Sequence, residues 1–218
     1  AIFSLAYSLS GGLKAVAMTD AVQVILLIFG GLAVSFIALN IISESNGVIE
    51  GMRVVMNEMP EKFDMVLSAD NSSYKDLPGI WILLGLGVWI GHFFYWGFNQ
   101  YITQRALAAK DIKEAQKGVM FAAYLKLLMP IVIVLPGICA AILFPMLEKS
   151  DQAYPTMMSL LPNGLLGLTF AALIAAIVSS LASMSNSIST IFTMDVYKYF
   201  KNDNVSQSNL IQVGRMTV

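Results

Sequence analysis

The sequence TFAALIAAIVSSLASMSNS, at residues 169–187, lies inside a longer stretch, residues 152–194, that contains no Asp, Glu, Lys or Arg. A helix needs about 20 mostly apolar residues to cross a lipid bilayer, so this stretch is too long for one span. Pro155 and the sequence PNG at residues 162–164 interrupt it, and both favour a loop over a helix. The sequence therefore predicts an extramembrane loop and then a membrane-spanning helix over residues 164–194.

Three other stretches share this apolar character: residues 21–42, residues 77–104 apart from His92, and residues 118–147 apart from Lys126. Uninterrupted runs of this length indicate helices, because a bilayer offers no water to backbone polar groups and the alternation of a membrane β-barrel is absent. We therefore expect an all-α membrane protein that forms one transmembrane domain. The expected spans are 17–42, 78–103, 118–147 and 164–194, and both chain ends are expected to lie inside a longer sequence.

The composition favours the same class. Hydrophobic residues make up 57% of the 218 residues and charged residues only 12%, whereas a soluble domain carries roughly 25% charged residues. The net charge of −1 leaves no basic surplus for nucleic acid, so the expected partner is the lipid bilayer. The single cysteine, Cys139, excludes a disulfide within the chain.

The charges between the spans predict the orientation, because basic residues concentrate in the cytoplasmic loops of membrane proteins. The segment 104–117 carries one Arg and three Lys against two acidic residues, whereas Asp and Glu dominate the segment 43–77. We therefore expect 104–117 and 195–210 to be cytoplasmic loops and 43–77 to be extracellular. The protein would be a multi-pass protein of the plasma membrane or the bacterial inner membrane.

Small or short polar residues recur along the segment 169–187 in steps of three and four, at positions 172, 176, 179, 183 and 186. This spacing places them on one face of the helix. One interpretation is a packing face, since small residues let helices approach closely in lipid. The other is a cation site, because Ser hydroxyls and backbone carbonyls are neutral oxygen ligands that can bind an ion and release it.

Aromatic residues cluster in the second half of the predicted span 78–103, around Tyr95 and Trp96. An aromatic belt at the membrane interface is one explanation, but these two residues lie deeper than such a belt, beside His92. Aromatic faces next to hydrogen-bonding groups suit a sugar, which combines apolar C–H faces with hydroxyls. His92 taken alone is more often a packing residue than a ligand.

Two charged residues lie within or at the edge of a span. Lys126 lies about two helical turns into its apolar run. It either extends to the cytoplasmic surface or has a function, which is the default hypothesis for an ionisable residue inside a membrane. Asp20 stands at the cytoplasmic entrance of the first span, either as an interface residue or as part of an ion path.

Together these residues resemble the sodium/solute symporter family, and in particular its sodium/galactose–glucose branch. The similarity runs nearly end to end. It rests on MTD at 18–20, YWGFNQ at 95–100, QR at 104–105, EAQKG at 114–118, Lys126, AAIVSSLAS at 175–183 and FTMD at 192–195. It implies the LeuT-type fold of two inverted five-helix repeats, of which the chain would hold core helices 5 to 8 and the ends of helices 4 and 9. It also implies a transporter and not an enzyme, with sodium-coupled symport of a galactose- or glucose-like sugar by alternating access.

The resemblance assigns the sodium ion to one site by position. The carbonyl of Ala176 and the hydroxyls of Ser179 and Ser180 would bind it, with further ligands from a helix outside the chain. The ion path would include Asp20 and Ser183.

The sugar contacts follow from the same resemblance. Tyr95 would be the aromatic inner gate that stacks on the sugar, with Trp96 beside it, and Lys126 would contact a sugar hydroxyl. Two positions depart from the family pattern. His92 replaces an Asn of the galactose transporters, which leaves the identity of the sugar open. Ala182 replaces a hydroxyl that some members use for a second sodium ion, so we expect one sodium ion per cycle.

Three alternatives stay open. One is a symporter of the same family for another small solute, such as an amino acid, an inositol or an organic acid. Another is a transporter-like sensor that binds a solute without moving it. The third is an intramembrane hydrolase that uses Ser179 or Ser180 with Lys126, although the sequence lacks a nucleophile-elbow motif.

Overall fold

The computed structural model describes residues 2–64, 66–71, 74, 85–201 and 205–217, and within these ranges it contains helices and no strand. Three of its helical stretches are long and apolar enough to cross a membrane, namely Ala17–Ile42, Ile112–Leu143 and Asn163–Phe200. The chain is therefore a multi-pass all-α membrane protein, which confirms the class predicted from the sequence.

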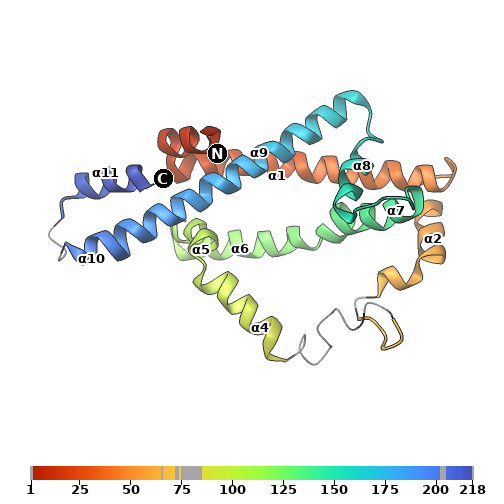
Figure 1. Ribbon diagram of the computed structural model, residues 1–218, viewed down its shortest axis with the longest axis horizontal. Helices are drawn as coiled ribbons and strands as arrows, with labels where there is room; N and C mark the ends of the chain where they lie inside the picture. The colour runs from red at the N-terminus through yellow and green to blue at the C-terminus, as the bar shows by residue number, and fades with distance from the viewer. Residues whose placement is uncertain (1, 65, 72–73, 75–84, 202–204, 218) are drawn as a thin grey trace. The chain divides into compact units, whose positions relative to one another are not determined.

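Each long stretch is assembled from labelled helices (Figure 1). The first is α1 (Ile2–Ile42). The second joins α6 (Ile112–Lys126) through the π-helical turn η4 (Pro130–Val134) to α7 (Leu135–Leu143). The third joins α9 (Asn163–Ile191) through the π-helical turn η6 (Phe192–Tyr197) to α10 (Lys198–Phe200).

The segment expected to span at 78–103 is divided in the structure. Residues 78–84 lie outside the described residues. The rest forms α4 (Leu86–Phe93), the π-helical turn η3 (Phe94–Phe98) and, after Asn99, α5 (Gln100–Leu107). Asn99 is extended, with φ −84° and ψ 108°, and its side chain accepts a hydrogen bond of 3.1 Å from the backbone N–H of Tyr101. Asn99 therefore caps α5 as a new helix, which is a preferred position for this residue type.

The expected extracellular segment 43–77 contains helices of its own. They are α2 (Val48–Glu58) and the short 3-10 helix η1 (Pro60–Phe63), while residues 65, 72–73 and 75–77 lie outside the described part. A second short pair, η5 (Ser150–Gln152) and α8 (Ala153–Met158), precedes α9. The positions of these segments relative to a bilayer stay a prediction.

The chain divides into two compact units, and α1, α6 and α9 each contribute to both. Unit 1 comprises residues 1–25, 94–119 and 171–218. Unit 2 comprises residues 26–93 and 120–170.

In unit 2 the helices pack closely at small residues of α1. Gly31 lies against the side chain of Val132 in η4, and Gly30 lies against Thr169 at the start of α9. One turn on from Gly31, the buried hydroxyl of Ser35 donates to the carbonyl of Ile131 at 2.5 Å and to that of Gly31 at 3.1 Å. A π-helical turn leaves some carbonyls without their usual partners, so Ser35 satisfies one of them from a neighbouring helix.

The helix α2 packs at the end of α1 and against α7 (Figure 1). Its buried side is formed by Gly51 and Val55. Gly51 lies against the backbone of Leu39, so close that a Cβ atom at position 51 would overlap the Leu39 carbonyl. The contact joins backbone to backbone, and it allows α2 to turn back directly after α1.

In unit 1 the last helix, α11 (Gln207–Thr217), packs against η6 (Figure 1). The hydroxyl of Ser189 in α9 donates to the carbonyl of Gly214 at 2.6 Å, and a Cβ atom at position 214 would lie 3.3 Å from that hydroxyl oxygen. The absence of a side chain at Gly214 thus sets how closely α11 approaches α9.

Gly51→Ala tests the backbone contact between α2 and α1. The new Cβ would overlap the Leu39 carbonyl, and overpacking of this kind costs about 1–3 kcal/mol. We expect a lower melting temperature for the full-length protein in detergent. Gly137→Ala in α7 is the matched control, because no atom lies within 4 Å of its Cβ position and Ala favours a helix more than Gly. Equal melting temperatures for the two variants would contradict the described packing of Gly51.

Candidate functional site

The helix α9 supplies the first side chains of the site. Ala172, Ser179 and Ser183 belong to the face of small residues that the sequence predicts, and all three are buried. Ala176 on the same face is half-buried, as is the neighbouring Ser180. The face is therefore turned towards other parts of the protein, as both the packing and the ion-binding interpretations require.

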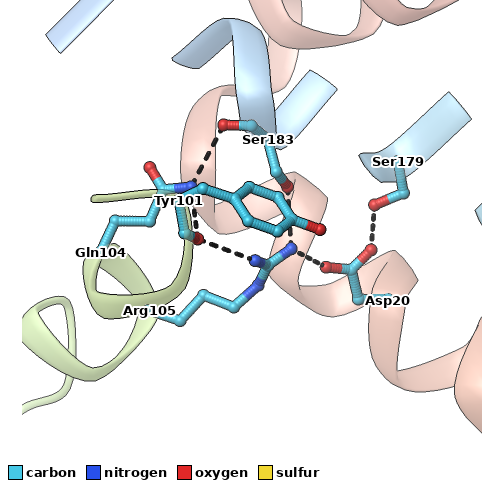
Figure 2. A network of polar contacts seen from close by, with 6 residues as sticks. All are labelled: Asp20, Tyr101, Gln104, Arg105, Ser179 and Ser183. Carbon is cyan, nitrogen blue, oxygen red and sulfur yellow. Dashed lines mark hydrogen bonds and ion pairs between the residues drawn. The ribbon is translucent and has the colours of Figure 1, made fainter. Parts of the chain in front are cut away.

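Asp20 of α1 meets this face through Ser179. The Ser179 hydroxyl donates to Oδ1 of Asp20, and Oδ2 of Asp20 accepts from Nη2 of Arg105 at 2.5 Å (Figure 2). The Asp20 side chain is 23% exposed and that of Arg105 is 34% exposed. A partly buried charge needs a partner of opposite sign, because an unpaired charge that has lost part of its contact with water is unfavourable. Asp20 and Arg105 neutralise one another.

Arg105 also binds α9 directly. The same Nη2 atom donates to the hydroxyl of Ser183 at 2.8 Å, while Nη1 donates to the backbone carbonyl of Tyr101 at 3.4 Å. The guanidinium carbon lies 5.5 Å from the centre of the Tyr101 ring, within the range of a cation–π contact. Figure 2 shows the guanidinium between the Asp20 carboxylate and the Ser183 hydroxyl.

Gln104 fixes the start of α5 against α9. Its Nε2 atom donates to the backbone carbonyls of Ser183 and Tyr101, both at 3.2 Å. The side chain is buried at 6% exposure. Buried amides that satisfy their donors in this way hold a local structure firmly. Gln104 thereby keeps Arg105, the next residue, beside Ser183.

We call this cluster the polar network. It consists of Asp20, Gln104, Arg105, Ser179 and Ser183, which all belong to unit 1. Its side-chain oxygen atoms come from one carboxylate, two hydroxyls and the amide of Gln104. Oxygen atoms of this kind are the ligands that hard cations such as sodium prefer. In the structure, Asp20 and Ser183 turn oxygen atoms of this kind towards the guanidinium of Arg105.

The structure brings together three of the residues predicted for sodium and its path: Asp20, Ser179 and Ser183. Ala176 and Ser180 lie beside Ser179 on α9. Their binding of sodium stays a prediction.

The residues predicted to contact the sugar fall into two groups. Tyr95 and Trp96 lie in η3 of unit 1, where their rings meet edge to face with centres 5.2 Å apart and an interplanar angle of 83°. Each is 42% exposed. His92 in α4 and Lys126 at the end of α6 belong to unit 2, and both are exposed. The sugar site as a whole stays a prediction.

Sequence reasoning missed Gln104 and Arg105 as site residues. The charge pattern predicts Arg105 as a basic residue of a cytoplasmic loop and assigns it no role in a site. A signal was present, because Asp20 at the edge of an apolar span requires a counter-charge. The pair Gln104-Arg105 also belonged to the motifs that carried the family resemblance.

Comparisons with known proteins bear on the whole chain. The family model described as "Sodium:solute symporter family" matches residues 1–218. The chain is 45% identical to the "Sodium/glucose cotransporter" of Vibrio parahaemolyticus, over 99% of this chain and 42% of that relative. It is 36% identical to the "Uncharacterized symporter YidK" of Escherichia coli K12, over 96% of this chain and 36% of the relative.

A human relative has a different named solute. The chain is 35% identical to the "Sodium/myo-inositol cotransporter 2" of Homo sapiens, over 97% of this chain and 35% of that relative. The chain thus spans about two fifths or less of the length of these relatives, whose names are those of transporters. With the match to residues 1–218, these similarities establish that the chain belongs to the sodium:solute symporter family.

Proposed function

We propose that the chain is part of a protein that carries a sugar across the membrane together with sodium. The observation that carries this proposal is the polar network, in which Asp20 joins Ser179 and Ser183 on the small-residue face of α9. The network sets oxygen ligands beside the residues predicted to bind sodium. Membership of the sodium:solute symporter family supports the same ion.

The sodium ion would bind to the carbonyl of Ala176 and the hydroxyls of Ser179 and Ser180, with Asp20 and Ser183 on its path. Neutral ligands suit an ion that must be released in every cycle. The Ser179 hydroxyl donates a hydrogen bond to Asp20, so the lone pairs of its oxygen would face a cation. An inward-negative membrane potential adds about 2.3 kcal/mol per charge per 100 mV to ion entry.

The sugar would bind beside Tyr95 and Trp96 in η3. Two rings at a large angle offer both a face for stacking and an edge, and sugar C–H groups pack well on aromatic faces. The similarity to a protein named as a sodium/glucose cotransporter supports a hexose. Binding of sodium and sugar to one outward-facing state would raise the affinity for each by the same factor.

A second candidate is a symporter of the same class with another solute. The similarity to a protein named as a sodium/myo-inositol cotransporter favours a cyclic polyol among these. An inositol resembles a sugar in shape and in its ring of hydroxyls, so the same aromatic pair would suit it. Amino acids and organic acids have less support, and the alternative of an intramembrane hydrolase has none from the named relatives.

The sodium ligands can be tested with Ser180→Ala in the full-length parent. Loss of a ligand to a charged ion costs about 1.5–3 kcal/mol, so we expect the half-saturating sodium concentration for sugar uptake into proteoliposomes to rise about tenfold or more. Thr190→Ala is the control on the same helix, since its exposed hydroxyl bonds only to the Asn186 carbonyl of α9. An unchanged sodium dependence for Ser180→Ala would show that the assigned sodium site is wrong.

The solute is tested by uptake of labelled glucose, galactose and myo-inositol with and without an inward sodium gradient. We expect saturable, sodium-dependent uptake of a hexose. Tyr95→Ala should raise the half-saturating sugar concentration about fivefold or more, because stacking on an aromatic ring adds about 1 kcal/mol beyond burial. Tyr95→Phe keeps the ring and should stay near the wild type.

Phe98→Ala serves as the control in the same π-helical turn, because Phe98 is highly exposed. Uptake of inositol in preference to both hexoses would select the second candidate. Uptake that does not depend on sodium for any solute would remove the proposed coupling.

A further inference from the structure

Arg105 occupies the position in the polar network where a cation would be expected. Its guanidinium contacts both Asp20 and Ser183, the two residues predicted to lie on the sodium path. We propose that Arg105 is a tethered cation that competes with the transported sodium ion for Asp20. This inference rests on the proposed function, and it adds a residue that the resemblance did not assign.

The contacts leave little room for both cations at once. Oδ2 of Asp20 accepts from Nη2 of Arg105 at 2.5 Å, and Oδ1 accepts from Ser179. The Ser183 hydroxyl accepts from the same Nη2 atom at 2.8 Å. A sodium ion that took ligands from Asp20 and Ser183 would have to displace the guanidinium, because two positive charges at one carboxylate repel each other. The two cations therefore bind in turn.

The attachment of α5 to α9 keeps Arg105 close to Asp20. Buried Gln104, in the middle of α5, holds this helix to the carbonyl of Ser183. The neighbouring Arg105 therefore cannot leave the vicinity while α5 stays in place. Its effective concentration at Asp20 is therefore set by this attachment and does not depend on the salt in solution.

When sodium displaces it from Asp20, the guanidinium can keep contacts with Tyr101. About a third of the Arg105 side chain is exposed, which allows it to move outward. The ring and the backbone carbonyl of Tyr101 already contact it, and neither contact requires Asp20. An aromatic ring and a carbonyl can hold a guanidinium at modest strength.

The exchange has a direct effect on sodium affinity. With Arg105 present, the charge of Asp20 is already balanced, so a sodium ion that arrives is bound weakly and can leave. Without Arg105, the negative charge of Asp20 would face the ion alone and hold it more tightly. A partly exposed ion pair contributes up to about 1 kcal/mol, so we expect the half-saturating sodium concentration to fall about fivefold when the charge of Arg105 is removed.

The test uses two variants at the same position in the full-length protein. Arg105→Gln removes the charge but keeps hydrogen-bond donors, and Arg105→Lys keeps the charge. Lys117→Gln is the matched control, because it removes a positive charge from an exposed pair with Glu114 in the next helix. The measurement is the sodium dependence of labelled glucose uptake into proteoliposomes. For a variant that does not transport, the melting temperature is measured against sodium concentration instead. The value compared is then the sodium concentration that gives half of the maximal rise in melting temperature.

We expect a fall of about fivefold in the half-saturating sodium concentration for Arg105→Gln, with Arg105→Lys and Lys117→Gln near the wild type. In an Asp20→Asn background, Arg105→Gln should not change the half-saturating sodium concentration further, because the carboxylate for which the two cations compete is absent. An unchanged or raised value for Arg105→Gln, by uptake or by melting, would overturn the proposal and indicate a purely structural clamp. A wild type that shows neither sodium-dependent uptake nor a sodium-dependent melting temperature would instead overturn the proposed function, and this inference with it.

Discussion

The carboxylate of Asp20 is the constraint on which the organisation of unit 1 depends. A negative charge at the edge of an apolar span is costly unless an opposite charge and hydrogen bonds compensate it. Here the compensation comes from two other segments: Arg105 of α5 and Ser179 of α9. One charged residue of α1 thereby fixes which sides of α5 and α9 turn towards it. In a chain with so few charges, this pairing specifies a local arrangement that apolar contacts between similar helices would leave less well defined.

Unit 2 is held by different means. Its helices meet where side chains are small or absent, as at Gly31 and Gly51, and close approach of helices is the main source of association in lipid. The one cross-helix polar contact described there, from Ser35 to the Ile131 carbonyl, compensates a backbone loosened by Pro130 and its π-helical turn. The polar network and the tightly packed contacts are thus found in different parts of the chain.

The class and the long helices could be predicted from the sequence, because apolar length is a strong signal. The small-residue spacing also predicted the buried face with Ser179 and Ser183. The break at Asn99 could not be predicted from hydropathy, since a capping residue within an aromatic run changes the backbone without changing the apolar character. Arg105 was missed for a related reason: a basic residue just past a span is counted as a loop charge until its partner, Asp20 of α1, is known. The roles of His92, Tyr95, Trp96 and Lys126 in binding a solute remain predictions, because residue type alone does not identify a ligand.

The cap at Asn99 has a consequence for how such a protein can change over generations. The aromatic pair of η3 and the charged end of α5 belong to separate helical pieces, joined by one extended residue. Substitutions around Tyr95 and Trp96 can therefore reshape the exposed aromatic surface of η3 without disturbing the register of α5 on α9. Such a joint would let the aromatic surface of η3 and the polar network change independently of one another over generations.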